Sequence, residues 1–326
     1  MEDDLSQILQ KGPPTAGSLA RLKPRDCLGF AYLLSAIATT STAIILASLG
    51  SWPVWLLGQL VLALALLQWF ILVHEAGHQT LFRTNALNLI FGHIAGFFAG
   101  LPYMSWKLVH YRHHKWTGWQ DLDATTVALV PRKLGNTERF LINSCWRLWI
   151  PIFNVIYRYS NYWDYRRIVD YLPNRRTRRH VFWNVFCLGL LYVAAIVVVG
   201  PINLLEFSWL GLVLTLAVQE NILLSQHTHI PMRLSSGVSV KPFGPIEQEN
   251  YTRSLRFPRW IAQILLMNFG HHELHHMYVR IPGYHLNKID YRTNDEVNWW
   301  EWIKESRRLS GEVFLFSSRE KSGFQI

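Results

Sequence analysis

The sequence has few charged residues and few cysteines. Asp, Glu, Lys and Arg make up 17% of its 326 residues, whereas half of the chain is hydrophobic. Soluble domains carry about 25% charged residues, so this low share indicates a membrane protein. The three cysteines, Cys27, Cys145 and Cys187, are scattered and form no C-x-x-C pair. Their pattern argues against a disulfide scaffold, a zinc ribbon and a cysteine-bound iron–sulfur cluster.

Residues 1–27 are predicted to be a short cytoplasmic tail. They begin acidic and then become rich in proline and glycine, without the basic start and apolar core of a cleavable signal peptide. We expect one membrane-embedded domain over residues 28–300, followed by a cytoplasmic C-terminal tail over residues 301–326.

Four apolar segments are long enough to cross a bilayer, which takes about 20 residues of helix. They cover about residues 28–50, 55–73, 181–200 and 204–224. The short turns Ser51–Trp52–Pro53 and Pro201–Ile202–Asn203 would pair them into two hairpins. The predicted fold is therefore an all-α integral membrane protein with four transmembrane helices and a cytoplasmic helical cap.

Basic residues predict the orientation of these spans. All 32 lysines and arginines lie before the first span, between the second and third, or after the fourth. The positive-inside rule then places both termini and the central loop in the cytoplasm. The formal net charge of +10 marks the face toward anionic lipid and an acidic protein partner rather than a nucleic-acid-binding surface.

Residues 88–104 form a further apolar segment. A fifth crossing would put the histidines before and after it on opposite sides of the membrane. The segment is also rich in glycine and ends near a proline. We therefore expect a re-entrant or interfacial element, which is tolerated at membrane depth where protein covers it.

Histidines gather in four clusters that this topology places on the cytoplasmic side. Positions i, i+3 and i+4 share one face of a helix, so the repeated spacings would aim two or three imidazoles in one direction. A lone His93 or His180 is more often structural. The clusters are His74 and His78; His110, His113 and His114; His227 and His229; and His272, His275 and His276.

The first cluster also matches H-E-x-x-H, the pattern of zinc proteases in which the glutamate acts as base. A catalytic zinc takes three protein ligands. Here the strict spacings supply eight histidines and the cluster at residues 226–229 at least one more. That number suits two metal ions, and the protease pattern is then coincidental. Imidazole binds iron, zinc, copper and nickel.

Taken together, these motifs resemble the membrane fatty acid desaturase superfamily, which also holds alkane hydroxylases and carotenoid ketolases. The closest likeness is to acyl desaturases of the oleate Δ12 type. It is carried by HEAGH at 74–78, HYRHHKWTGWQDLD at 110–123, QHTHIP at 226–231 and HELHHMYVRIPGYH at 272–285. Outside these boxes the likeness is thin.

The resemblance implies a non-haem di-iron centre that uses O₂ as co-substrate. Its nine ligands would be His74, His78, His110, His113, His114, His227, His272, His275 and His276, with His229 as the alternative to His227. Asp123 and Glu75 would orient ligand imidazoles, while His271 and His285 would support the site or the fold.

The implied reaction is insertion of a cis double bond into a fatty acyl chain or membrane lipid. Hydroxylation or ketolation on the same scaffold is the alternative, because ligand spacing does not set the product. A metal-binding or transport protein is disfavoured, since few ionisable residues beyond Glu206 and Glu220 lie in the spans. Without a dinucleotide motif or a redox domain of its own, the chain would need a ferredoxin or cytochrome b5-like electron donor. The acyl carrier, the double-bond position, the oligomeric state and the membrane of residence stay open.

Overall fold

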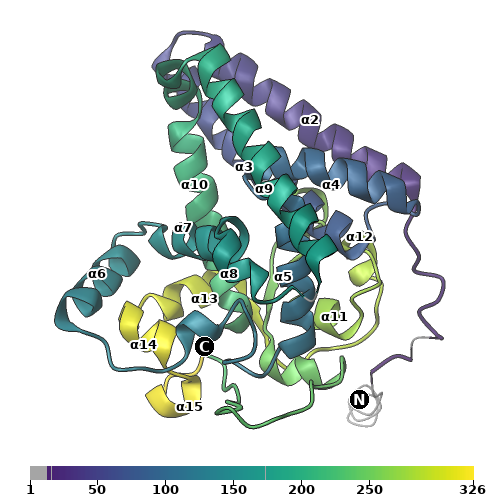
Figure 1. The fold of residues 1–326 in the computed structure, drawn as a ribbon, viewed down its shortest axis with the longest axis vertical. Coiled ribbons are helices and arrows are strands. Elements are labelled where there is room, and N and C mark those ends of the chain that lie inside the picture. The colour runs from purple at the N-terminus through teal and green to yellow at the C-terminus, as the bar shows by residue number, and fades with distance from the viewer. Residues whose placement is uncertain (1–12, 16, 173) are drawn as a thin grey trace, which may run out of the picture.

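The computed structural model describes residues 13–15, 17–172 and 174–326. Residues 1–12, the first part of the predicted N-terminal tail, lie outside the described residues. Long helices project from one side of a body built from short helices and loops (Figure 1). The predicted functional histidines lie where the two parts meet.

Four helices are long and apolar enough to cross a membrane. They are α2 (Asp26–Ser48), α3 (Trp52–His78), α9 (Arg175–Val199) and α10 (Pro201–His227). All four predicted spans are therefore present as helices, and α3, α9 and α10 extend beyond the predicted bounds. The predicted turns are wrong in detail, because Pro53 and Pro201 lie in the first turn of α3 and α10. Proline tolerates that position, since its missing N–H has no partner there in any helix.

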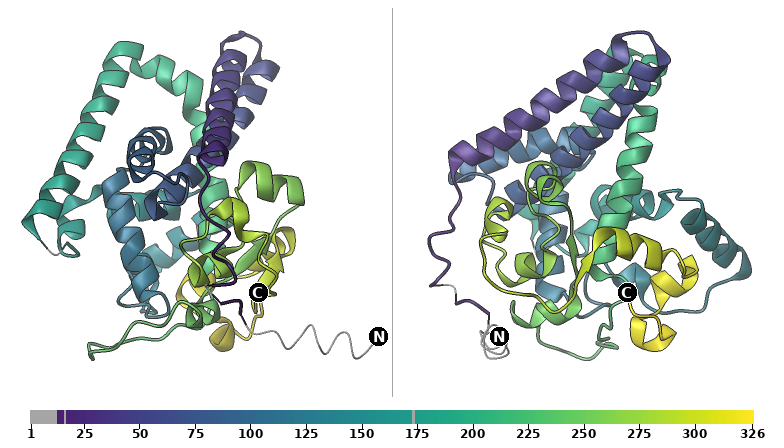
Figure 2. Two further views of the ribbon diagram at one scale, coloured as in Figure 1. Left: turned by 90° about the vertical axis from the view of Figure 1, so that its right-hand side faces the viewer. Right: turned by 180° about the vertical axis from the view of Figure 1, so that it is seen from behind.

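Helices α2 and α3 pack along each other, and α10 packs against α3. The Trp69 indole of α3 donates to Thr40 Oγ1 of α2 at 2.8 Å. Gln59 of α3 binds the α10 backbone twice, donating to Phe207 O at 2.8 Å and accepting from Gly211 N at 2.9 Å. By contrast, α9 diverges from α10 beyond their junction at Gly200 (Figure 2).

The segment predicted as re-entrant forms two helices, α4 (Asn85–Ala99) and α5 (Tyr103–Trp116), bent by 98°. Gly100 takes the left-handed conformation with φ 70° at the end of α4. The Tyr103 hydroxyl donates to Ala76 O of α3 at 2.9 Å. The bend thereby brings α5 to the end of α3. Its re-entrant or interfacial place in a membrane stays a prediction.

The body holds the remaining elements. Its helices along the central segment are α6 (Asn136–Arg147), α7 (Ile152–Arg158) and α8 (Tyr165–Val169), with a 3₁₀ turn at Val127–Leu129 and a π-helical turn at Tyr159–Trp163. After α10 come a 3₁₀ turn at Glu247–Tyr251, a π-helical turn at Ile261–Leu265, α11 (His272–Met277), α12 (Gly283–Leu286), α13 (Trp299–Ser306), α14 (Gly311–Phe316) and α15 (Arg319–Ser322).

Two short strands modify the all-α prediction. Strand β1 (Ser254–Arg256) pairs in parallel with β2 (Glu296–Asn298), in the register Leu255 to Val297. Three-residue strands leave too short a pattern for a period of two to be recognised in the sequence.

The segment predicted as a C-terminal tail packs into the body. Trp302, Phe314, Leu315 and Ile326 are buried in one cluster with Trp146 of α6. The buried Arg253 side chain donates to Ile326 O and so anchors the last residue. Residues 301–326 therefore contribute to the same core as the central segment.

Candidate metal centre

Four helices bring histidines to one place: the end of α3, α5, the end of α10, and α11. Their side-chain nitrogens form two compact groups, and within each group the nitrogens lie within 4.8 Å of one another. The first group is His74, His78, His110 and His275; the second group is His113, His227, His272 and His276. Each group has four potential ligands and is largely buried.

His114 belongs to neither group but lies beside both. Its Nε2 is 3.1 Å from Nε2 of His110 and 3.1 Å from Nε2 of His275, both in the first group. Its ring centroid is 4.2 Å from that of His276 in the second group. All nine histidines predicted as ligands thus come together.

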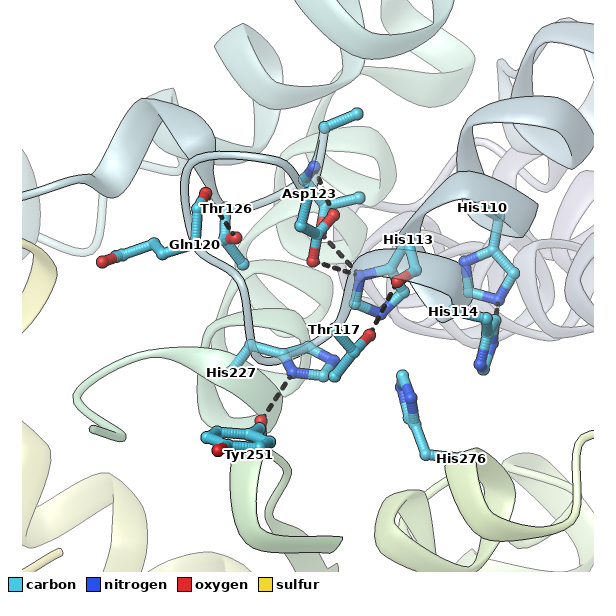
Figure 3. A network of polar contacts seen from close by, with 12 residues as sticks. His110, His113, His114, Thr117, Gln120, Asp123, Thr126, His227, Tyr251 and His276 are labelled. Atoms are coloured by element: carbon cyan, nitrogen blue, oxygen red, sulfur yellow. Dashed lines mark hydrogen bonds and ion pairs between the residues drawn. The ribbon is translucent and has the colours of Figure 1, made fainter. Parts of the chain in front are cut away.

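Several imidazoles are oriented by an acceptor at Nδ1. His113 Nδ1 lies 2.7 Å from Asp123 Oδ2, and His227 Nδ1 lies 3.1 Å from Tyr251 O (Figure 3). His276 Nδ1 lies 2.9 Å from Gln248 Oε1, and His74 Nδ1 lies 3.0 Å from Glu75 Oε1. Such acceptors select the tautomer with a proton on Nδ1 and leave the Nε2 lone pair free for a metal.

The contacts among Nε2 atoms fit metal ions. His272 Nε2 lies 2.8 Å from His227 Nε2 and 3.1 Å from His276 Nε2, and both of these partners carry their proton on Nδ1. His74 Nε2 is buried and has no hydrogen-bond partner among the described residues. A neutral His272 has one Nε2 proton at most for these two lone pairs, and a buried unpaired nitrogen is costly unless a cation binds it. The donor set therefore fits one metal ion in each group.

Burial also favours the protonation state that metals require. The pKa values of His272, His275 and His276 are held well below the usual range of histidine, first by burial and then by the neighbouring histidines. These imidazoles are therefore neutral at pH 7, the form that ligates a metal.

Glu75 lies in the position that a protease would use for its base, but its carboxylate is fully engaged. It accepts from Thr80 Oγ1 at 2.8 Å and from Gly283 N at 2.9 Å, in addition to its contact with His74. A carboxylate held by three partners orients His74 and joins α3 to α12. This geometry gives no support to the protease pattern, and the supporting role of Glu75 stays a prediction.

The other histidines lie outside both groups. His229 Nε2 lies 2.8 Å from Ser322 Oγ, in the C-terminal segment. Of the two candidates at residues 226–229, the structure therefore brings His227 to the cluster. His271 is the residue before the first turn of α11, and His285 is buried beside the ring of Tyr284.

A cavity of about 920 Å³ adjoins the histidines. Members of both groups line it, and its further walls come mainly from apolar residues of α6, α7, α10 and α14. The described wall includes Phe70, Leu141, Phe153, Ile156, Leu223, Phe269 and Phe316. This site can hold two cations next to a long apolar ligand.

The sequence analysis missed part of this arrangement. Thr125 Oγ1 lies 2.9 Å from His113 Nδ1, and Gln248 and Tyr251 orient histidines through contacts between distant segments. No local motif marks Gln248 or Tyr251, because each acts through one amide or carbonyl oxygen. Among the residues that accept from Nδ1 atoms of the second histidine group, only Asp123 lies in a motif that the sequence analysis singled out.

Comparison with known proteins agrees with this chemistry. The family described as fatty acid desaturase matches residues 50–299. An sn-1 oleoyl-lipid 12-desaturase of Picosynechococcus sp. is 24% identical over 93% of this chain and 85% of its own length.

Two plant proteins are similar at comparable identity. An acyl-lipid omega-3 desaturase (cytochrome b5) of the endoplasmic reticulum of Arabidopsis thaliana is 23% identical over 77% of this chain and 66% of its own length. An sn-2 acyl-lipid omega-3 desaturase (ferredoxin) of its chloroplast is 23% identical over 88% of this chain and 68% of its own length. Because the family match covers most of the chain and includes every histidine of both groups, the protein belongs to the fatty acid desaturase family and is an oxidoreductase of the desaturase type.

Proposed function

We propose that this protein inserts a cis double bond into the acyl chain of a membrane lipid in an O₂-dependent reaction. Two non-haem iron ions would be held by nine histidines: His74, His78, His110, His113, His114, His227, His272, His275 and His276. The observation that carries the proposal is the position of the two histidine groups beside an apolar cavity of about 920 Å³.

Bound iron would supply the oxidising power, from O₂, that breaking a C–H bond of an unactivated methylene requires. The chain's own residues perform the remaining tasks. Asp123, Glu75 and Gln248 hold their imidazoles in the tautomer that offers Nε2 to the metal. Preorganised ligands of this kind fix the position of the oxidising centre relative to the substrate.

The cavity positions the substrate. An acyl chain has many nearly equivalent methylenes, so selection depends on which one is held next to the metal. Phe70 and Phe269 line the cavity close to its histidines, and the His74 ring lies 4.9 Å from that of Phe269. These apolar side chains would keep water away and hold the chain in place.

Electrons would come from a separate protein. The names of two relatives specify cytochrome b5 and ferredoxin, respectively. We propose a donor of one of these classes, docking on the basic face that the charge distribution predicts to be cytoplasmic. In this topology both termini and the metal centre face the cytoplasm.

Hydroxylation or ketolation of an acyl or carotenoid substrate would use the same metal centre. The relatives reported above are all named as desaturases, which favours the double bond as the product.

The first experiment combines the metal content of the purified protein with lipid analysis of a host that expresses it. We expect two irons per chain and a new unsaturated acyl species, both lost in His113→Ala. The control is His180→Ala, because His180 is exposed on α9 and should leave both unchanged. Two irons with a hydroxylated or keto product would move the function to the alternative. One zinc per chain with unchanged lipids would contradict the di-iron proposal.

A further inference from the structure

Helices α6 and α7 expose an apolar surface although neither is one of the four candidate spans. Phe140, Leu141, Leu148, Ile150, Ile156 and Tyr159 are all exposed, and Phe140 and Leu148 expose 69% and 66% of their surface. We call these six residues the α6–α7 surface. Exposed apolar side chains concentrated in one short stretch of the chain mark contact with a protein or a membrane.

The position of α7 favours the membrane. Asn154 of α7 donates its backbone N–H to the Glu220 carboxylate at 3.0 Å and its side-chain amide to Leu216 O at 2.9 Å. Both partners belong to α10, one of the four helices that can span a bilayer. Helix α7 therefore packs against the second half of a helix that can span a bilayer.

Charges beside the surface also suit a bilayer. Arg132, Lys133, Arg139 and Arg147 are exposed close to it. Basic residues next to an apolar face are typical of a segment that lies in the interface and meets anionic head groups.

The surface is continuous with the cavity that holds the histidine groups. Leu141 and Ile156 belong to the α6–α7 surface and also line the cavity. Arg132 and Glu138 lie at the same rim, paired with each other, and their side chains are 48% and 41% exposed. An apolar path thus leads from the outside of the molecule to the histidines, with an exchangeable ion pair beside its entrance.

We propose that this rim is a lateral port through which the acyl chain of a bilayer glycerolipid enters. This inference rests on the proposed function and adds the route by which a lipid-linked chain reaches the histidines. The chain would slide between Leu141 and Ile156 without leaving the apolar phase. Arg132, held over the Phe316 ring at 5.3 Å, would release Glu138 and bind the phosphate or ester oxygens of the head group. A lipid-linked substrate fits this entrance because its polar end can stay in the interface.

The test uses a phospholipid that carries a photoreactive diazirine in its acyl chain, in vesicles containing the full-length protein. After illumination, mass spectrometry should find lipid adducts on peptides covering residues 137–160. Ile156→Arg should lower the yield of these adducts at least about tenfold, because a charge at the entrance of the cavity opposes the passage of an apolar chain. Val238→Arg is the matched control, since Val238 is 68% exposed in the loop after α10 and lies outside the described cavity lining.

Arg132→Gln should lower the adduct yield, because Arg132 lines the cavity. Lys241→Gln should not, because Lys241 is exposed in the loop after α10 and lies outside the described cavity lining. Unchanged iron content would show that each variant is folded.

Adducts confined to the spans, or equal yields for Ile156→Arg and Val238→Arg, would overturn the port. Adducts in the expected peptides without an unsaturated product would support the port and contradict the proposed function. An unsaturated product without such adducts would support the proposed function and contradict the port.

Discussion

At the scale of single residues, the orientation of several imidazoles depends on what accepts the Nδ1–H. Asp123 is completely buried and serves His113 in the second group. Asp123→Asn removes the charge that fixes this ring, so we expect a loss of iron affinity of about 10–100-fold at the second group. Competition against a chelator of known affinity measures this loss.

The matched control is Asp121→Asn. Asp121 lies two residues away but binds Ser235 and the backbone N–H of Ser236, away from the histidines. Iron affinity should be unchanged in this variant. Equal losses of iron affinity in both variants would mean that Asp123 affects the site only by stabilising the conformation of residues 120–125.

A second prediction separates His227 from His229. His227→Ala should lose the iron of the second group, because His227 is one of its four members. His229→Ala should keep both irons, because its partner is Ser322. Iron per chain in the two purified variants decides this point, and retention of two irons by His227→Ala would contradict the ligand set.

The histidine spacings explain why so much of the site was predictable. Both H-x-x-H-H repeats lie on short helices, and a helix presents i, i+3 and i+4 on one side whatever its surroundings. The choice between His227 and His229 could not be made from spacing. His229 has φ 65°, beyond the end of α10, and that backbone conformation turns its side chain to another part of the body.

At the scale of elements, the close contact between α2 and α3 depends on one glycine of α3. A Cβ on Gly58 would lie 2.7 Å from Ala47 N of α2, and a backbone atom cannot move aside cheaply. Gly58→Ala should lower the free energy of unfolding by about 1–3 kcal/mol, in the range for overpacking. Gly189→Ala in α9 should have little effect, because its Cβ would meet nothing within 4 Å. Thermal unfolding in detergent compares the two, and similar melting temperatures would contradict the tight contact.

A second contact at this scale joins the end of α13 to α6. The Arg307 guanidinium lies 3.6 Å from the centroid of the Trp146 ring and 3.9 Å from that of Trp149, and it donates to Asn221 Oδ1 at 2.8 Å. Arg307→Lys removes the planar stack and should lower the free energy of unfolding by about 2 kcal/mol.

Arg308→Lys is its control. Arg308 is 68% exposed and contacts Glu305, so its replacement should cost little. A melting temperature for Arg307→Lys no lower than that of Arg308→Lys would show that the stack does not stabilise the contact.

The sequence predicted the long helices well and their arrangement less well. Apolar length alone identifies α2, α3, α9 and α10, since it follows from bilayer thickness. The divergence of α9 from α10 depends on the conformation of Gly200, which has φ 88°, and no pattern in the apolar residues encodes it.

At the scale of the whole molecule, the site depends on segments that are far apart in the chain. Leu315 and Phe316 of α14 line the cavity, and Arg139 of α6 pairs with Glu312 of α14 at 2.9 Å. Residues 301–326 carried no histidine motif, and their mixed composition suited a tail. Their place in the cavity wall follows from long-range packing, which periodicity cannot reveal.

The excess of positive charge leads to the last prediction, which concerns electron supply. The chain carries 32 basic and 22 acidic residues, and the basic ones avoid the short turns of the spans. An acidic ferredoxin would be steered to the proposed cytoplasmic face by long-range attraction, and salt screens such attraction over a Debye length of about 8 Å at 0.15 M ionic strength. We therefore expect the rate of iron reduction by ferredoxin to fall as ionic strength rises. Reduction by a small uncharged reductant should not change, because it needs no steering, and this reaction is the control. Stopped-flow absorbance measures both rates. If both respond equally to salt, ionic strength acts on the metal centre itself, and the basic face has no part in docking the donor.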